Sequence, residues 1–193
     1  MPLSRRRVTD ASALKALAHP VRLALLELLV VDGPRTASQA GAALGETPSN
    51  CSWHLRKLAE HGFVREVPGV PGRSRPWRAV TEGLTWGDTD EDAETSAAGD
   101  ALTDMLLERE VQRLRASRAA AATEPAEWRE ATSFNQAATW MTAAEAEDLG
   151  AAMVELFQAH TERIADPESR PDGARLVSLV GWLVPSGPLR SEK

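Results

Sequence analysis

One stretch, residues 47–61, constrains the fold of this chain more than any other. It opens with Thr47 and Pro48, a side-chain cap followed by a proline at the first helical position, and Gly62 follows its end. The spacing i, i+4 and i+7 predicts that only a narrow stripe of this helix is buried: Cys51, Leu55 and Leu58. Polar and cationic side chains occupy most of the remaining positions. Such a helix suits insertion into the major groove of DNA.

The charge of the chain is divided unevenly between its two parts. Residues 1–80 hold twelve Lys or Arg and six Asp or Glu, a net charge of +6. Residues 81–193 hold ten Lys or Arg and twenty-two Asp or Glu, a net charge of −12. A polyanion would therefore be attracted to the N-terminal part alone, although two solvated surfaces that merely differ in charge would give the same counts.

Three shorter helices are predicted ahead of this stretch. Helical patterns cover residues 10–18, 21–31 and 36–44, and proline or glycine separates each from the next. Gly45 then breaks the third helix just before the Thr47 cap. A short helix, a tight turn and a second helix with a polar outer side constitute a helix-turn-helix.

A β-hairpin is predicted directly after it. Residues 63–67 and 77–80 read as two strands, joined by a loop at 68–76 that contains Arg73 and Arg75. Arginines at the tip of such a hairpin can reach phosphate or the minor groove. The sequence therefore predicts a winged helix-turn-helix.

At this point a family resemblance is evident in two segments. Leu17 to Leu29 reads LAHPVRLALLELL, and Ser49 to Val64 reads SNCSWHLRKLAEHGFV. Together they resemble the arsenic-repressor (ArsR-like) family of winged-helix transcription regulators. The most specific part is the spacing of Ser52, His54, Leu55, Leu58 and Gly62. The resemblance covers residues 10–80 and implies a homodimeric DNA-binding repressor or activator with helix 47–61 in the major groove.

The chain departs from the metal-sensing members of that family in one helix. Residues 36–44, TASQAGAAL, contain no cysteine, histidine or carboxylate. The cysteine-pair metal site that the family carries in this helix is therefore absent, and we expect neither a metal nor another cofactor.

Nine side chains on the helix and the wing are predicted to contact DNA: Ser49, Asn50, Ser52, Trp53, His54, Arg56, Lys57, Arg73 and Arg75. Two of them have a second interpretation, since His54 could fix the helix against its neighbour and Trp53 could fold back onto the domain. Cys51 could be a thiol sensor, but on an apolar stripe it is better interpreted as a small core residue.

Composition divides the chain into three parts. We predict a DNA-binding domain at 1–82, an acidic linker at 83–99, and a dimerisation and ligand-sensing region at 100–193. A long amphipathic helix over 100–122 must cover its apolar stripe, either with a second subunit or with the C-terminal domain of its own chain.

The C-terminal part is predicted to form a small α+β domain. A capping-box pattern opens a helix over 142–165, and apolar runs at 134–141 and 174–185 read as strands. Five residues could line a pocket for a small non-metal ligand, or could be plain core: Trp140, Met153, Phe157, His160 and Trp182. The fold class is thus mainly α with α+β character, an N-terminal winged helix-turn-helix followed by a long helix and a small α+β domain.

Several functions are disfavoured by what the sequence lacks. It has no GxSxG, phosphate-loop, HExxH or CxxC motif, and no run of eighteen apolar residues that could span a membrane. The single cysteine favours the cytoplasm. We therefore expect a cytoplasmic homodimeric regulator that binds double-stranded DNA, with a small-molecule effector as a further partner. The alternatives are a protein-interaction module with the same fold, or an enzyme that uses a polar C-terminal residue such as His160.

Overall fold

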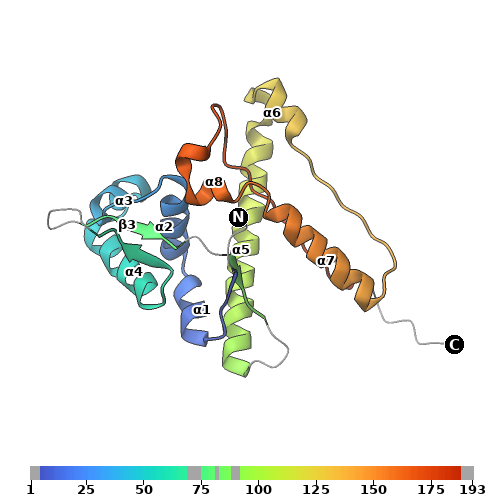
Figure 1. The fold of residues 1–193 in the computed structure, drawn as a ribbon, viewed down its shortest axis with the longest axis horizontal. Helices are drawn as coiled ribbons and strands as arrows, with labels where there is room; N and C mark the ends of the chain where they lie inside the picture. The colour runs from blue at the N-terminus through green and yellow to red at the C-terminus, as the bar shows by residue number, and fades with distance from the viewer. Residues whose placement is uncertain (1–4, 69–74, 81–82, 88–91, 188–193) are drawn as a thin grey trace.

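The computed structural model describes residues 5–68, 75–80, 83–87 and 92–187. Figure 1 shows one long helix, α5 (Ala93–Ala120), with the N-terminal elements on one side of it and a second C-terminal helix, α7 (Ala143–Phe157), on the other. None of the helices in the described ranges combines the length and apolarity that crossing a membrane requires.

Four helices build the N-terminal half, and all four were predicted. They are α1 (Ala11–Leu17), α2 (Pro20–Val31), α3 (Ala37–Leu44) and α4 (Pro48–Glu60). Each begins at a side chain that accepts a backbone N–H: Asp10, His19, Thr36 and Thr47. Their apolar sides share one core with the start of α5, and its largest fully buried members are Leu14, Leu17, Leu25, Leu55, Leu58 and Leu102.

Two small sheets flank these helices. The predicted wing is confirmed, because β2 (Val64–Glu66) and β3 (Trp77–Ala79) pair antiparallel with Arg65 opposite Arg78. The second sheet was not predicted: β1 (Arg5–Arg7) pairs in parallel with β4 (Gly83–Thr85). It joins the start of the chain to the segment that leads into α5.

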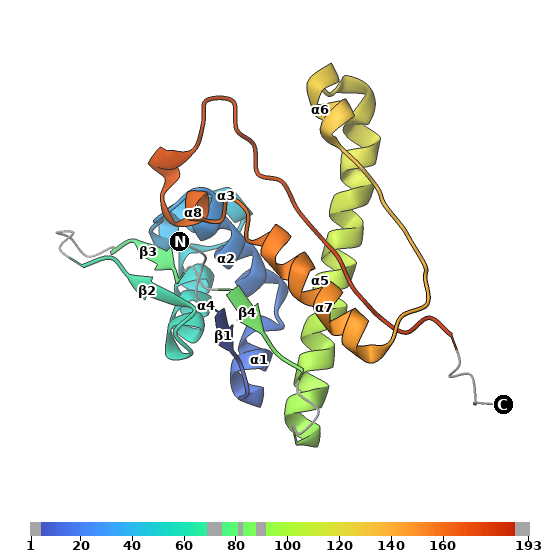
Figure 2. The same cartoon turned by 45° about the vertical axis from the view of Figure 1, so that its right-hand side comes forward.

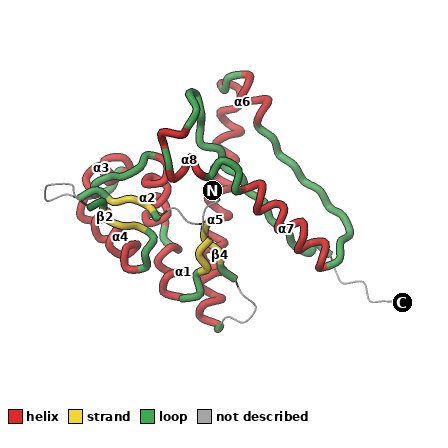
Figure 3. Tube along the Cα trace, viewed as in Figure 1, coloured by secondary structure: helices red, strands yellow, loops and turns green. Residues whose placement is uncertain are grey.

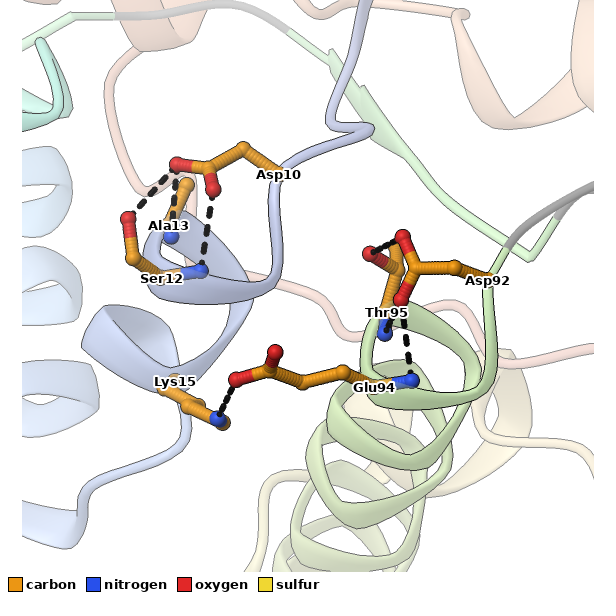
Figure 4. Close-up of polar contacts among 7 residues, drawn as sticks. All are labelled: Asp10, Ser12, Ala13, Lys15, Asp92, Glu94 and Thr95. Atoms are coloured by element: carbon orange, nitrogen blue, oxygen red, sulfur yellow. Dashed lines mark hydrogen bonds and ion pairs between the residues drawn. The ribbon is translucent and has the colours of Figure 1, made fainter.

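The prediction of an acidic linker over 83–99 is wrong. Its first residues form β4, and its last seven form the start of α5, which the Asp92 carboxylate caps through the N–H groups of Glu94 and Thr95 (Figure 4). Thr95 and Ala98 are buried there, because this end of α5 packs against α1. Because small residues make this contact within an otherwise acidic segment, the composition of the segment did not predict it.

The fully buried residues of helix α5 all lie near its start. Leu102 is buried in the N-terminal core. Further along, Arg109 and Arg113 form ion pairs with Glu27 of α2. Along this same stretch of α5, the apolar stripe stays 38–41% exposed at Leu107, Val111 and Leu114. The stripe was predicted to be covered either by a second subunit or by the chain's own C-terminal domain. Within the described residues the chain covers only part of it, and the remainder faces outward.

The C-terminal half consists of helices joined by long loops, and its described residues, up to 187, form no strand and therefore no α+β domain of the kind predicted. After α5 come η1 (Ala121–Thr123), α6 (Ala126–Ala131), α7, α8 (Glu162–Ala165) and η2 (Pro167–Ser169). The predicted helix over 142–165 is interrupted between α7 and α8, where His160 adopts a positive φ of 63°. Figure 2 shows α8 beside α2, and Arg170 donates to the carbonyl oxygens of Val31 and Val30 at 3.0 and 3.5 Å.

Both strands predicted in this half are wrong. Residues 134–141 and 174–185 are extended but pair with no strand among the described residues, and Figure 3 draws both as loops. An apolar run becomes a strand only where a neighbouring strand accepts its backbone hydrogen bonds. The described part of the chain offers these two runs no such neighbour.

Candidate nucleic-acid interface

The centre of the candidate interface is α4, which is buried along one stripe. Cys51, His54, Leu55 and Leu58 face the core. The other sides of the helix carry hydroxyl, indole and cationic groups: Ser49, Ser52, Trp53, Arg56 and Lys57, all exposed or half-buried. The stripe therefore fixes the helix while leaving its donors accessible to a ligand.

A tight turn holds α4 against α3. Gly45 ends α3 in the left-handed region with a φ of 69°, and Thr47 then caps α4 by accepting from the N–H of Asn50. Gly41 lies so close to the turn that a Cβ there would come 2.6 Å from the backbone oxygen of Glu46. Only glycine at this position permits the two helices to approach so closely.

His54 is part of the buried stripe, which corrects its prediction as a DNA contact. Its side chain is 4% exposed, and its ring lies 4.5 Å, centroid to centroid, from that of His19 at the start of α2. Burial lowers the pKa of His54, and the charges of His19 and Arg22 lower it further. His54 therefore takes the other role predicted for it and fixes α4 against its neighbour.

Two residues beside His54 also had alternative roles. Cys51 is fully buried, and burial together with the Glu46 carboxylate raises the pKa of its thiol, so the group is a neutral core residue. Trp53 is 50% exposed, and its ring meets that of His54 edge-on at 4.8 Å. Trp53 thus rests partly on the domain and still presents half of its surface outward.

The polar groups of the candidate interface are held by partners on the chain. The Asn50 amide donates to the Glu46 carboxylate at 2.8 Å, and the Arg56 guanidinium folds back to donate to Ser52. Carboxylates also pair with two of the predicted cations: Glu60 with Lys57 at 2.8 Å, and Glu66 with Arg75 at 3.2 Å. Arg73 lies outside the described residues.

The hairpin contributes two cations that were not among the predicted contacts. Arg65 on β2 and Arg78 on β3 are paired directly across the sheet, and both are exposed. Neither forms an ion pair with a carboxylate in the described ranges. Like charges opposite each other repel, so this pair suits a site that receives an anion. The alternation of residues in the two predicted strands could have located them.

The five residues predicted to line a ligand pocket are not brought together. Trp140 and His160 flank opposite ends of α7, a helix of fifteen residues that spans about 22 Å at 1.5 Å per residue. Trp140 and Trp182 are 80% and 66% exposed, whereas Met153 and Phe157 contact Gly181. Nowhere in the described part of the chain do three or more His, Cys, Asp or Glu side chains converge as a metal site requires.

Together, α3, the glycine turn, α4 and the β2–β3 hairpin define a winged helix-turn-helix protein. The comparisons with known proteins agree, since residues 17–67 match the model of a helix-turn-helix domain family. The chain is 30% identical to a possible transcriptional regulator for arsenical resistance of known crystal structure, over 55% of this chain and 95% of that one. The TM-score is 0.32, so the likeness rests on the sequence. No curated protein gives a significant match.

The helix-turn-helix part of this chain belongs to the ArsR-like transcription regulators, as the two sequence segments predicted. The described α3 contains none of the cysteine, histidine or carboxylate side chains that could bind a metal in that helix.

Proposed function

We propose that the protein is a cytoplasmic transcription regulator that binds specific DNA sequences as a homodimer. In this proposal α4 enters the major groove, and the hairpin lies on the phosphate backbone or in the minor groove. The observation that most supports it is the outward side of α4, where Ser49, Arg56 and Lys57 are accessible while the opposite stripe is fully buried. This side offers donors for base edges and cations for phosphates.

Two further features support the same proposal. The two hairpin arginines, Arg65 and Arg78, which form no ion pair with a carboxylate of the described residues, extend the cationic surface beyond α4. The net charge of +6 on residues 1–80, against −12 on the remainder, would direct DNA to this half of the protein. Contacts that α4 makes within the chain, such as Asn50 with Glu46, would exchange for contacts to bases when DNA binds.

The test is selection of binding sites from random-sequence DNA with the purified protein, repeated at two salt concentrations. Enrichment of a palindromic site, with affinity that falls as salt rises, would support a dimer that reads sequence. A double Asn50→Ala and Arg56→Ala variant should lose the enriched site. A matched Arg118→Ala and Asn135→Ala variant, altered at exposed positions outside the winged helix, should retain it.

Two other outcomes would change the proposal. Salt-sensitive binding without an enriched site would indicate a non-specific DNA-binding protein. Absence of binding at low salt would favour the alternative of a protein-interaction module that uses the same fold. A small-molecule effector stays a prediction, since the described residues bring no predicted pocket together.

A further inference from the structure

An uncharged, exposed segment close to the C-terminus lies outside the winged helix and takes no part in the candidate DNA interface. Residues 176–187 contain no Asp, Glu, Lys or Arg. Seven large apolar side chains in this segment are 42–66% exposed: Leu176, Val177, Leu179, Val180, Trp182, Leu183 and Val184. Large exposed apolar side chains that follow one another in a single segment of a folded protein often mark an interaction site.

The segment is fixed in place by contacts along one of its sides. Just before it, the Arg175 guanidinium pairs with Glu124 at 2.6 Å and lies over the ring of Trp128, 4.9 Å from its centroid. The Ser178 hydroxyl donates to Glu110 of α5 at 2.9 Å. The apolar side chains are therefore exposed on a chain that α5 and α6 hold in position.

A close packing contact continues this attachment on α7. A Cβ at Gly181 would lie 2.6 Å from the Met153 side chain and 2.9 Å from that of Phe157. Glycine thus lets the backbone rest directly on α7. Arg113 of α5, which pairs with Glu27, also donates to Ser178 at 3.2 Å.

Most backbone groups of the segment have no hydrogen-bond partner among the described residues, although the carbonyl oxygen of Val184 accepts from the Ser186 hydroxyl at 3.3 Å. Among the described residues, the N–H and C=O groups of 175–187 make no backbone hydrogen bond; the preceding one joins Ala174 to Pro171. Extended chain with open backbone groups and apolar side chains is a template for pairing with another chain.

We propose that this surface, residues 176–187, is where a second copy of the same chain docks. The inference rests on the homodimer proposed above and names its contact. Residues 81–193 carry a net charge of −12, so most self-contacts in this half would bring like charges together. The uncharged segment avoids that repulsion, and it offers no charge by which an acidic or basic partner could be selected.

The available area also fits a second copy. Taking about 150 Å² for a large apolar side chain, seven that are roughly half exposed offer about 500 Å². The exposed stripe of α5, on the helix that holds Ser178, adds Leu107, Val111 and Leu114. Together they approach the roughly 800 Å² per partner of a standard interface.

The test measures the mass of the full chain by sedimentation equilibrium across a wide range of protein concentration. A double Val180→Glu and Trp182→Glu variant should raise the dissociation constant of the dimer by roughly 100-fold or more, because docking would bury unpaired carboxylates. Trp53→Glu is the matched control, since it replaces an exposed tryptophan on α4, and its dimer should dissociate as the wild type does. Leu179→Arg repeats the test with the opposite charge and should give the same loss.

The possible results separate the docking surface from the homodimer itself. A wild-type dimer whose dissociation constant is unchanged in both the Val180→Glu/Trp182→Glu variant and the Leu179→Arg variant would overturn this surface and leave the homodimer standing. A wild-type chain that is monomeric at every concentration would overturn both. Unchanged helical circular dichroism in the variants would show that loss of the dimer is not loss of folding.

Discussion

The imidazole rings of His19 and His54 lie 4.5 Å apart, centroid to centroid, where the start of α2 meets α4. His19 caps α2 by accepting the N–H of Val21 at its Nδ1. Burial lowers the pKa of both rings, and Arg22 lowers each further. Glu46 opposes this shift at His54 only. The two rings are therefore packed as neutral groups at neutral pH.

From this pair we predict a stability that depends on pH. The pKa of each ring is lower in the folded state, so the unfolded chain binds more protons below the ordinary histidine pKa of about 6.5. The stabilisation is fully present above that pH and is lost as the pH falls toward the folded-state pKa values. Each unit of pKa difference contributes about 1.4 kcal/mol. Denaturant titrations between neutral and acidic pH would measure the loss.

A single substitution isolates the contribution of His54. Replacing it with Phe keeps an aromatic ring in the stripe and removes one titrating group, so the free energy of unfolding should vary less with pH. His160→Asn is the control: the side chain of His160 is 67% exposed, and Asn tolerates its positive φ. An unchanged pH dependence in His54→Phe would show that the histidine pair is not its source.

The turn between α3 and α4 gives a second prediction. Gly41→Ala would place a Cβ 2.6 Å from the backbone oxygen of Glu46, and backbone cannot move aside as a flexible side chain can. We expect a loss of roughly 1–3 kcal/mol in the free energy of unfolding. Gly150→Ala on α7 is the matched control, because no atom lies within 4 Å of its Cβ position. It should stabilise the protein by up to about 1 kcal/mol. Equal effects of the two substitutions would contradict the packing argument.

The winged helix could be predicted because its signals are local. Caps such as Thr47, breakers such as Gly45 and the helical spacing of Leu55 and Leu58 act within a few residues of each other. For His54 the sequence left two roles open, a DNA contact or a contact that fixes the helix. It could not identify the ring that His54 packs against, because His19 is thirty-five positions away in the sequence. Arg65 and Arg78 were missed although alternation places both on the outer side of the hairpin.

The C-terminal half could not be predicted equally well, because its structure depends on partners. The run at 174–185 has the composition of a buried strand, yet composition does not tell whether another strand lies beside it. The segment at 83–99 has the composition of a solvated linker, yet Thr95 and Ala98 are small enough to pack against α1. In both segments tertiary contacts decide the outcome.

The contact between the winged helix and α5 gives a third prediction. Glu27 of α2 pairs with both Arg109 and Arg113 of α5, and all three side chains are half-buried. Glu27→Gln would leave two neighbouring cations without their shared carboxylate and should cost roughly 1–2 kcal/mol. Lys15→Gln is the control, because Lys15 and Glu94 form an exposed pair at 2.6 Å, seen in Figure 4. It should change the free energy of unfolding by less than about 0.5 kcal/mol. Urea titrations of both variants would compare them, and similar losses would contradict a special role for Glu27.

The arginine pair of the hairpin gives a fourth prediction, in which stability and DNA binding change in opposite directions. Replacing Arg65 and Arg78 with Thr removes two like charges that face each other across β2 and β3. The free energy of unfolding should rise by roughly 0.2–1 kcal/mol. If these arginines bind phosphates, affinity for DNA should fall, and the dependence of log K on log salt should weaken by about two.

This combination separates a binding surface from a structural one. A merely structural pair would change stability without changing affinity for DNA, and a general loss of folding would lower both together. The double Arg115→Thr and Arg118→Thr variant removes the same charge from exposed positions on α5, outside the hairpin. It should leave both the affinity and its salt dependence near the wild-type values. Fluorescence anisotropy with labelled duplex DNA at several salt concentrations measures both quantities, and an equal loss in the two double variants would assign the effect to net charge rather than to the hairpin.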